Sequence, residues 1–308
     1  MIKSEKISGL IAAPFAPMDE RGVLACERIP DYYDFLEKNG IAGAFINGST
    51  GEGVSLSSKE RMVITEHWMA RAREKKTVKI INLVGGTSYQ ECIDQAHHSE
   101  DQGVYAIALL APYYFKPSSA SQLAGFCAKV AESVPQLPVY FYHIPVLTGC
   151  HVPMIEFLKE ASVLIPNLVG IKFTQEDFMD FLSCLRFMDG KYDMLWGRDE
   201  NLLSALVLGA RGGVGSTYNY AAPLYHRLIA AYDEGNLELA RELQMSSIKM
   251  ISLLGKYGGI GTGKAYMKYI GFDCGKFRLP IKNVSDEDYR KFSAEVDELQ
   301  MGHLFSLV

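Results

Sequence analysis

The feature of this sequence that most restricts its fold is an alternation between short, uniformly apolar runs and longer amphipathic stretches. The apolar runs occur at residues 10–14, 43–46, 79–84, 106–110, 139–142, 168–173, 194–196 and 212–215. Their apolar residues are continuous and do not alternate with polar ones. Runs of this kind are typical of strands that are buried on both faces, as in a parallel sheet.

The stretches between the runs have the length and periodicity of the helices that connect parallel strands. The clearest of them lie at 57–73, 89–102, 120–133 and 154–161. The first opens with Ser57 and Glu60, whose spacing predicts a capping box. Eight strands separated by helices predict an α/β protein whose sheet closes into a (β/α)8 TIM barrel.

Beyond about residue 222 the sequence contains helical stretches without strand-like runs, at 224–234, 237–254, 263–270 and 286–299. No linker, charge block or low-complexity tract divides the chain. We therefore expect a barrel catalytic region over residues 1–222. Residues 223–308 are expected to form a C-terminal helical extension that includes the last barrel helices and packs on the barrel.

Charge and hydropathy exclude several classes of partner. The chain has 31 Lys and Arg residues against 36 Asp and Glu residues, so it offers no electrostatic reason to bind nucleic acid or an anionic membrane surface. The most apolar stretch, 104–115, is shorter than the ~20 residues that a membrane span needs. The N-terminal apolar run is stopped by Pro14, which is too early for a signal peptide. We therefore expect a cytoplasmic protein.

The cysteine, histidine and glycine patterns predict no disulfide, metal or phosphate site. The six cysteines include no CxxC pair and the seven histidines form no HExxH-like pattern, so we expect free thiols packed as small hydrophobic residues. The segment GGIGTGK at 258–264 fits the GxxxxGK pattern of phosphate-binding loops. However, Ala265 follows it in place of a hydroxyl residue, and no strand precedes it.

Candidate functional residues follow the apolar runs, because the active site of a parallel barrel lies at the carboxyl ends of its strands. Polar or small residues at these places are Ser49, Thr50, Tyr142, Thr174, Gly197, Asp199, Glu200 and Ser216. The Gly-Ser-Thr-Gly segment around Ser49 could hold a carboxylate or a phosphate with its backbone N–H groups. It could equally be an ordinary glycine-rich turn.

Lys172 is the most informative candidate, because it stands inside an apolar run whose residues should be buried. Burial would lower its pKa from about 10.4 and release a neutral amine, which can attack a ketone and form a Schiff base. Two alternatives stay open: the lysine reaches solvent at the strand end, or it pairs with a carboxylate. Tyr142 could move a proton to or from a substrate hydroxyl, or it could be a core tyrosine.

Five segments, GSTGEG, PYY, YFYHIP, GIKFT and GSTYNY, occur in one order at barrel spacing. Together they resemble the pyruvate-dependent, Schiff-base class I aldolases, the family of dihydrodipicolinate synthase and N-acetylneuraminate lyase. The similarity is greatest to the N-acetylneuraminate lyase branch, on the segments FINGSTGEGVSLS, KFT and WGRDENLLSALVLGA. In YHIPVLTG, Leu147 stands where dihydrodipicolinate synthases carry an arginine that clamps a second carboxylate, and leucine cannot form that clamp.

This resemblance implies a reversible cleavage of N-acetylneuraminate to pyruvate and N-acetylmannosamine. It implies that Lys172 condenses with the C2 ketone of the sugar acid. Ser49 and Thr50 would hold the pyruvyl carboxylate. Tyr142, alone or together with the substrate carboxylate, would assist proton transfer at the C4 hydroxyl.

The resemblance also assigns the remaining contacts and the assembly. Thr174 would orient the sugar, and the glycerol-like tail would be bound by Gly197, Asp199, Glu200 and Ser216. A homotetramer is implied, in which Tyr114 reaches toward a neighbouring subunit's site, and no metal or other cofactor is required. The alternatives are an aldolase for another 2-keto sugar acid, a dihydrodipicolinate synthase, which Leu147 disfavours, and a barrel that binds such acids without turnover.

Overall fold

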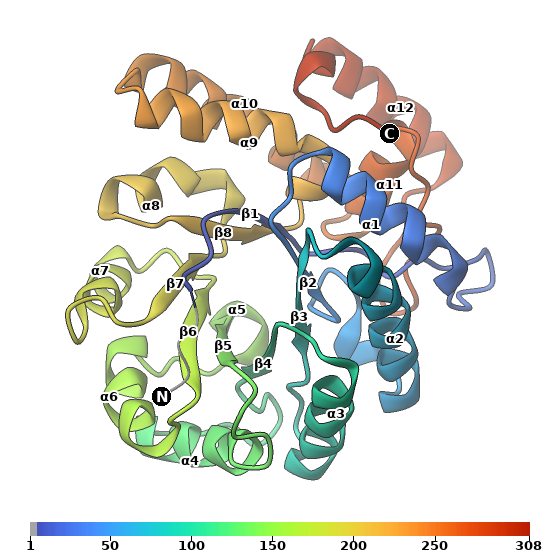
Figure 1. Ribbon diagram of the computed structural model, residues 1–308. Coiled ribbons are helices and arrows are strands. Elements are labelled where there is room, and N and C mark those ends of the chain that lie inside the picture. Colours follow the sequence, from blue (N-terminus) through green and yellow to red (C-terminus); the bar gives the residue numbers. More distant parts are fainter. Residues whose placement is uncertain (1–4) are drawn as a thin grey trace.

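The computed structural model, which describes residues 5–308, is a closed barrel of eight parallel strands in sequential order (Figure 1). The strands are β1 Gly9–Ala12, β2 Gly43–Ile46, β3 Lys79–Leu83, β4 Ala106–Leu110, β5 Val139–His143, β6 Leu168–Phe173, β7 Asp193–Trp196 and β8 Gly212–Gly215. Strand β8 pairs with β1 and closes the barrel. The expected (β/α)8 fold is confirmed. Residues 1–4 of the expected barrel region lie outside the described residues.

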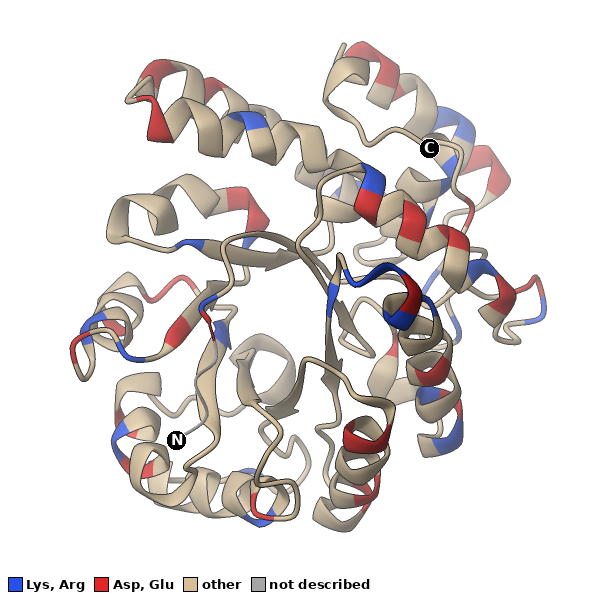
Figure 2. Ribbon diagram, viewed as in Figure 1, with Lys and Arg blue, Asp and Glu red and all other residues tan. Residues whose placement is uncertain are grey.

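Helices surround the strands as an outer ring (Figure 1). They are α1 Ile29–Lys38, α2 Ser58–Lys75, α3 Tyr89–Gln102, α4 Ala120–Ala131, the short α5 Pro145–Thr148, α6 Met154–Leu164, α7 Phe178–Arg186, α8 Leu202–Leu208 and α9 Tyr218–Asp233. The charged residues lie mainly on these helices and on the loops, whereas most of the strand ribbon is uncharged (Figure 2). The capping box at the start of α2 is confirmed, because Ser57 and Glu60 each accept a hydrogen bond from the other's backbone N–H.

The strands pack apolar side chains on both of their faces, which explains the continuous apolar runs. On β6, Ile171 and Phe173 belong to the large core between the strands and the helices. A second cluster, which includes Phe45, Tyr142 and Leu195, fills the interior of the barrel. Successive residues of a strand point to opposite faces, so Lys172 points into that interior.

Three further helices, α10 Leu237–Tyr257, α11 Gly261–Tyr269 and α12 Asp286–Glu298, lie together beside the barrel (orange to red in Figure 1). Helix α9 begins earlier than expected, at Tyr218, and Ala221 interrupts it with φ −136° and ψ 33°. The interruption precedes Pro223, which cannot continue a regular helix because it lacks an N–H group. The domain boundary expected after residue 222 falls within this helix.

Two other properties of the chain follow from the fold. All six cysteines are free and buried, as expected, and burial raises the pKa of Cys26 and Cys92 to about 11. No helix within the described residues is both long and apolar enough to cross a membrane.

Candidate active site

A cavity of about 270 Å³ opens at the carboxyl ends of the strands. It is lined by the side chains or backbone of Ser49, Thr50, Tyr142, Lys172, Thr174, Gly197, Asp199, Glu200 and Ser216. A larger hollow of about 740 Å³ opens near the amino ends of β7 and β8, between Lys6, Asp193 and Arg211. Barrel enzymes carry their chemistry at the carboxyl ends of the strands, so the smaller cavity is the candidate active site.

Lys172 lies at the base of this cavity, where its side chain is almost fully buried. The residue is 4% exposed, and its Nζ lies 4.1 Å from the ring centroid of Phe45 and 4.0 Å from that of Tyr142. Within residues 5–308, no carboxylate lies within ion-pair distance of Nζ. The lysine therefore neither reaches solvent nor pairs with a carboxylate, which were the two structural alternatives.

The surroundings of Lys172 lower the pKa of its amine. Burial lowers the pKa of Lys172 to about 7, and the nearby charge of Asp199 offsets part of that shift. A substantial fraction of the amine is therefore neutral at neutral pH, and only the neutral amine is a nucleophile. Gly170, two residues earlier on β6, has no room for a Cβ, which would lie 2.1 Å from the Asp193 carbonyl oxygen.

Tyr142 pairs directly with Lys172 in the register between β5 and β6. Its hydroxyl lies 3.5 Å from Oγ of Ser49, and its ring packs edge-on against Phe45. Burial raises the pKa of Tyr142 to about 12, while the hydroxyls of Ser49 and Thr174 oppose that rise. The phenol is therefore protonated at neutral pH, and it lies between the lysine and the loop after β2.

The loop after β2 places Ser49 and Thr50 in the cavity wall. It begins at Asn47 in the left-handed conformation, and the Asn47 side-chain amide donates to Oδ1 of Asn82 at 2.8 Å. The loop folds back so tightly that a Cβ on Gly53 would lie 1.7 Å from the Asn47 carbonyl oxygen. The glycines of this motif therefore serve a compact turn that presents two hydroxyl groups to the cavity.

Asp199 belongs to the 3-10 helix η3 Asp199–Asn201, and it is a buried residue of the cavity wall. It is 5% exposed, and its Oδ2 accepts hydrogen bonds from the backbone N–H of Thr217 at 3.0 Å and from Oγ1 of Thr217 at 2.6 Å. Its Oδ1 is buried without a partner among the described residues. Burial raises the pKa of Asp199 to about 6, while the Thr217 hydroxyl opposes that rise.

Two glycines give the cavity its shape. A Cβ on Gly215, at the end of β8, would lie 2.0 Å from Oδ1 of Asp199. A Cβ on Gly197, directly after β7, would lie 2.0 Å from Oγ1 of Thr174. The close approach of Asp199 and Thr174 to the strand ends therefore requires glycine at both positions.

Glu200 lies at the mouth of the cavity beside an ion pair that the sequence did not predict. Arg198 also lines the cavity; its Nε donates to Oε1 of Glu176 at 2.6 Å and lies 3.4 Å from Oε1 of Glu200. Arg198 and Lys172 are the two cationic residues among the described lining residues.

An apolar wall completes the cavity, and the sequence did not identify it. Its lining includes Ile251 and Leu254 from α10, Ile260 before α11, and also Ile144 and Leu147. The C-terminal helices thus contribute to the site as well as to the fold. Helical periodicity shows only that such residues are apolar and does not show which part of the barrel they face.

Tyr114, which the resemblance assigned to a neighbouring subunit's site, and His143, which ends β5, are not among the lining residues of the cavity. Tyr114 is 78% exposed and stacks edge-on with Phe115 at a ring-centroid distance of 5.1 Å. His143 is buried against Phe173, and its Nε2 lies 2.7 Å from Oε1 of Gln175. Burial lowers the pKa of His143, so its role here is that of a packed, neutral side chain.

The described residues contain no group of three or more His, Cys, Asp or Glu side chains arranged to hold a metal ion. The polar groups that converge on the cavity are one buried amine, one guanidinium, one phenol, several hydroxyls and two carboxylates. This set can form a covalent imine with a keto acid, move protons beside it and bind the hydroxyls of a longer substrate.

Comparison with known proteins finds one matching family and several similar enzymes. The chain matches the model of the dihydrodipicolinate synthetase family over residues 6–299. It is 37% identical over 303 residues to N-acetylneuraminate lyase of Gallus gallus, covering 97% of this chain and 98% of that protein. It is 38% identical over 287 residues to N-acetylneuraminate lyase of Homo sapiens, covering 92% and 89%. The solved structure of N-acetylneuraminate lyase from Proteus mirabilis matches it with a TM-score of 0.92 at 35% identity, covering 96% and 99%.

Proposed function

The chain belongs to the dihydrodipicolinate synthetase family, and on that premise we propose that it is an aldolase that reversibly cleaves N-acetylneuraminate to pyruvate and N-acetylmannosamine. The observation that carries the proposal is Lys172, an unpaired buried amine with a pKa of about 7 at the base of the cavity. A keto acid that enters with its carboxylate toward Ser49 and Thr50 brings its C2 carbonyl to this amine.

The reaction begins when the neutral amine of Lys172 adds to the C2 carbonyl of the open-chain sugar acid. Loss of water then leaves an iminium ion on the lysine. The positive charge of the iminium is favoured by Asp199, whose charge already favours the ammonium form of Lys172. The iminium supplies the electron sink for the next step, so no separate cofactor is needed for it.

Bond cleavage follows when the C3–C4 electron pair moves toward the iminium. The C4 hydroxyl loses its proton and becomes the aldehyde of N-acetylmannosamine, and the lysine keeps an enamine of pyruvate. Because the pKa of Tyr142 is about 12, the phenol takes up the C4 proton only as it passes its own proton on. The substrate carboxylate accepts that proton, either directly or through the Ser49 hydroxyl at 3.5 Å, which gives up its own proton as it receives the one from Tyr142. Protonation of the enamine at C3 and hydrolysis of the imine release pyruvate.

The remaining polar groups distinguish a long polyhydroxylated substrate from pyruvate alone. Thr174 orients the sugar chain, and Gly197, Asp199, Glu200 and Ser216 bind its tail. The buried Oδ1 of Asp199, which has no partner among the described residues, is an acceptor available to a substrate hydroxyl. Leu147 lines the mouth and offers no guanidinium for a second carboxylate, which argues against a dihydrodipicolinate synthase.

Two measurements test the proposal together. Incubation with N-acetylneuraminate should release pyruvate, and borohydride reduction in the presence of pyruvate should add one reduced pyruvyl group per chain at Lys172. Lys172→Arg serves as the control, since a guanidinium stays protonated and cannot act as the nucleophile. An adduct that maps to another lysine would contradict the mechanism. Pyruvate trapping without cleavage of N-acetylneuraminate would point to an aldolase for another 2-keto sugar acid.

We also propose that the chain works as a cytoplasmic homotetramer. The exposed aromatic pair Tyr114 and Phe115 follows β4, and exposed apolar groups of this kind are typical of surfaces that meet a second protein. In such an assembly Tyr114 would reach toward the site of a neighbouring subunit. Light scattering, which gives the number of chains in the particle, tests the assembly.

A further inference from the structure

The loop that presents Ser49 and Thr50 is fastened to the C-terminal helices by a buried ion pair. Oε1 of Glu52 lies 3.1 Å from Nζ of Lys264, and their side chains are 0% and 2% exposed. Lys264 also donates to the Lys276 carbonyl oxygen at 2.8 Å, and Oε2 of Glu52 accepts the backbone N–H of Arg278 at 2.9 Å. The lysine of the GGIGTGK segment is therefore engaged in a contact inside the protein.

Glu52 is coupled tightly to the residues that precede it. It adopts the left-handed conformation at φ 58° and ψ 19°, and its backbone N–H donates to the Ser49 carbonyl oxygen at 3.2 Å. At the other end of the loop, the side chain of Asn47 is fixed by Asn82 on β3. Ser49 and Thr50 thus lie between two anchored residues, one held by the barrel and one held by the C-terminal region.

The same ion pair joins two walls of the active-site cavity. Lys264 belongs to α11, and Ile260, which immediately precedes that helix, lines the same cavity as Ser49 and Thr50. Burying two charges is costly, and an apolar pair of similar volume often stabilises a fold equally well. An ion pair with additional hydrogen bonds also fixes the distance and the relative orientation of the two segments that carry it.

We propose that Glu52 and Lys264 are positioning residues for pyruvate capture: their contact fixes Ser49 and Thr50 where these meet the pyruvyl carboxylate. The inference rests on the proposed function, because it needs pyruvate to bind beside Lys172. Neither residue lines the cavity, so both act through the loop.

The test compares Glu52→Gln, Lys264→Met and the double variant in the full chain. The half-saturating pyruvate concentration for borohydride-trapped adduct, read by intact mass, should rise about ten- to a hundredfold in all three variants. The pH midpoint of trapping should stay unchanged, because it depends on the surroundings of Lys172. Each single variant leaves one buried charge unpaired and should lose thermal stability, whereas the double variant should recover most of that loss.

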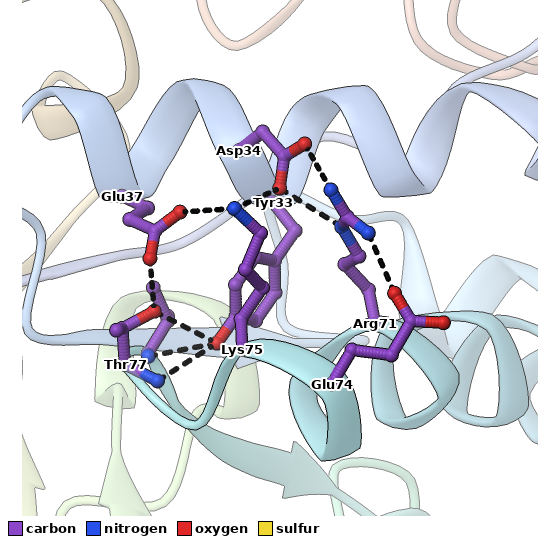
Figure 3. A network of polar contacts seen from close by, with 8 residues as sticks. Tyr33, Asp34, Glu37, Arg71, Glu74, Lys75 and Thr77 are labelled. Atoms are coloured by element: carbon purple, nitrogen blue, oxygen red, sulfur yellow. Dashed lines mark hydrogen bonds and ion pairs between the residues drawn. The ribbon is translucent and has the colours of Figure 1, made fainter.

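A second ion pair, more exposed and absent from the lining of the cavity, provides a control. Asp34 of α1 accepts a hydrogen bond from Nε of Arg71 of α2 at 2.9 Å, within the network that also contains Glu37 and Lys75 (Figure 3). Asp34→Asn should lower thermal stability and leave the half-saturating pyruvate concentration unchanged. If the double variant traps pyruvate at the unmodified chain's concentration, the Glu52–Lys264 pair only stabilises the fold and the inference is wrong. If the unmodified chain traps no pyruvate, the proposed function fails, and this inference fails with it.

Discussion

At the scale of single residues, the proposed chemistry depends on a lysine held where its charged form is disfavoured. Lys172 has two aromatic rings beside its amine and no ion-pair partner among the described residues. The burial that lowers its pKa to about 7 also opposes folding, because the charged amine must leave water. Reactivity and stability therefore conflict at this position.

Lys172→Met should abolish pyruvate trapping and raise the free energy of unfolding by about 1–4 kcal/mol near pH 7. The pKa of Lys172 is about 7 in the folded chain and about 10.4 when unfolded. Between these values the unfolded chain binds the extra proton, so the stability of the unmodified protein rises with pH. The advantage of the methionine variant should therefore shrink from about pH 7 to about pH 10, as measured by urea unfolding. An advantage that stays constant over this range would contradict the assigned pKa.

Tyr142→Phe should keep the fold and still form the pyruvate adduct, since the phenol is not the nucleophile. Its turnover of N-acetylneuraminate should fall by roughly 10²–10⁴, the usual size of a general acid–base contribution. Steady-state pyruvate release and borohydride trapping on the same preparation measure the two effects. Turnover close to that of the unmodified chain would make Tyr142 a packing residue.

At the scale of elements, the absence of a side chain at two glycines shapes the ends of β7 and β8. The Asp199 carboxylate occupies the space that a side chain on Gly215 would need, and Thr174 does the same at Gly197. The strand ends therefore determine how close the substrate-binding groups come to the barrel axis.

Gly215→Ala should lower kcat/KM for N-acetylneuraminate by about 10², because the new methyl group must displace Asp199. Gly125→Ala on α4 is the matched control: no atom lies within 4 Å of its added Cβ, and alanine favours the helix. The control should gain about 0.5–1 kcal/mol of stability and keep its activity. Equal activity of both variants would show that Asp199 can move without consequence.

Most elements of the barrel could be predicted from the sequence, because strands buried on both faces leave continuous apolar runs. Strands β2, β4, β6 and β8 lie where the runs place them. Helices α1, α7 and α8 were not assigned; α8 reads LLSALVL, which is apolar on nearly every face and so has no helical periodicity. The start of α9 was placed too late because Pro223 resembles a helix boundary.

The sequence predicts the lining residues that lie at the ends of strands. It does not predict contacts between residues that are far apart in the sequence. Nine of the ten candidate residues line one cavity, since the carboxyl ends of parallel strands converge. The support of Asp199 by Thr217, the ion pair of Arg198 with Glu176 and the Glu52–Lys264 contact are pairings between separate loops. Spacing along one sequence does not identify such partners.

At the scale of the whole molecule, light scattering at micromolar concentration should give the mass of about four chains. Phe115→Glu should lower that mass, because it places a charge in the exposed aromatic pair with Tyr114. The folded state should be retained, since Phe115 is 86% exposed in the single chain. A single-chain mass for the unmodified protein would refute the tetramer.

The depth of each group in the cavity also determines how such a protein can diverge by mutation. Lys172 and Tyr142 lie in the packed lumen, where almost any replacement disturbs several neighbours. Leu147, Arg198 and Glu200 lie at the mouth, where a replacement alters which tail fits and leaves the amine in place. New substrate preferences should therefore be reachable through single steps at the mouth, each of which keeps a working aldolase. A library confined to these three positions should change the preference among sugar acids while it keeps the Lys172 amine in place.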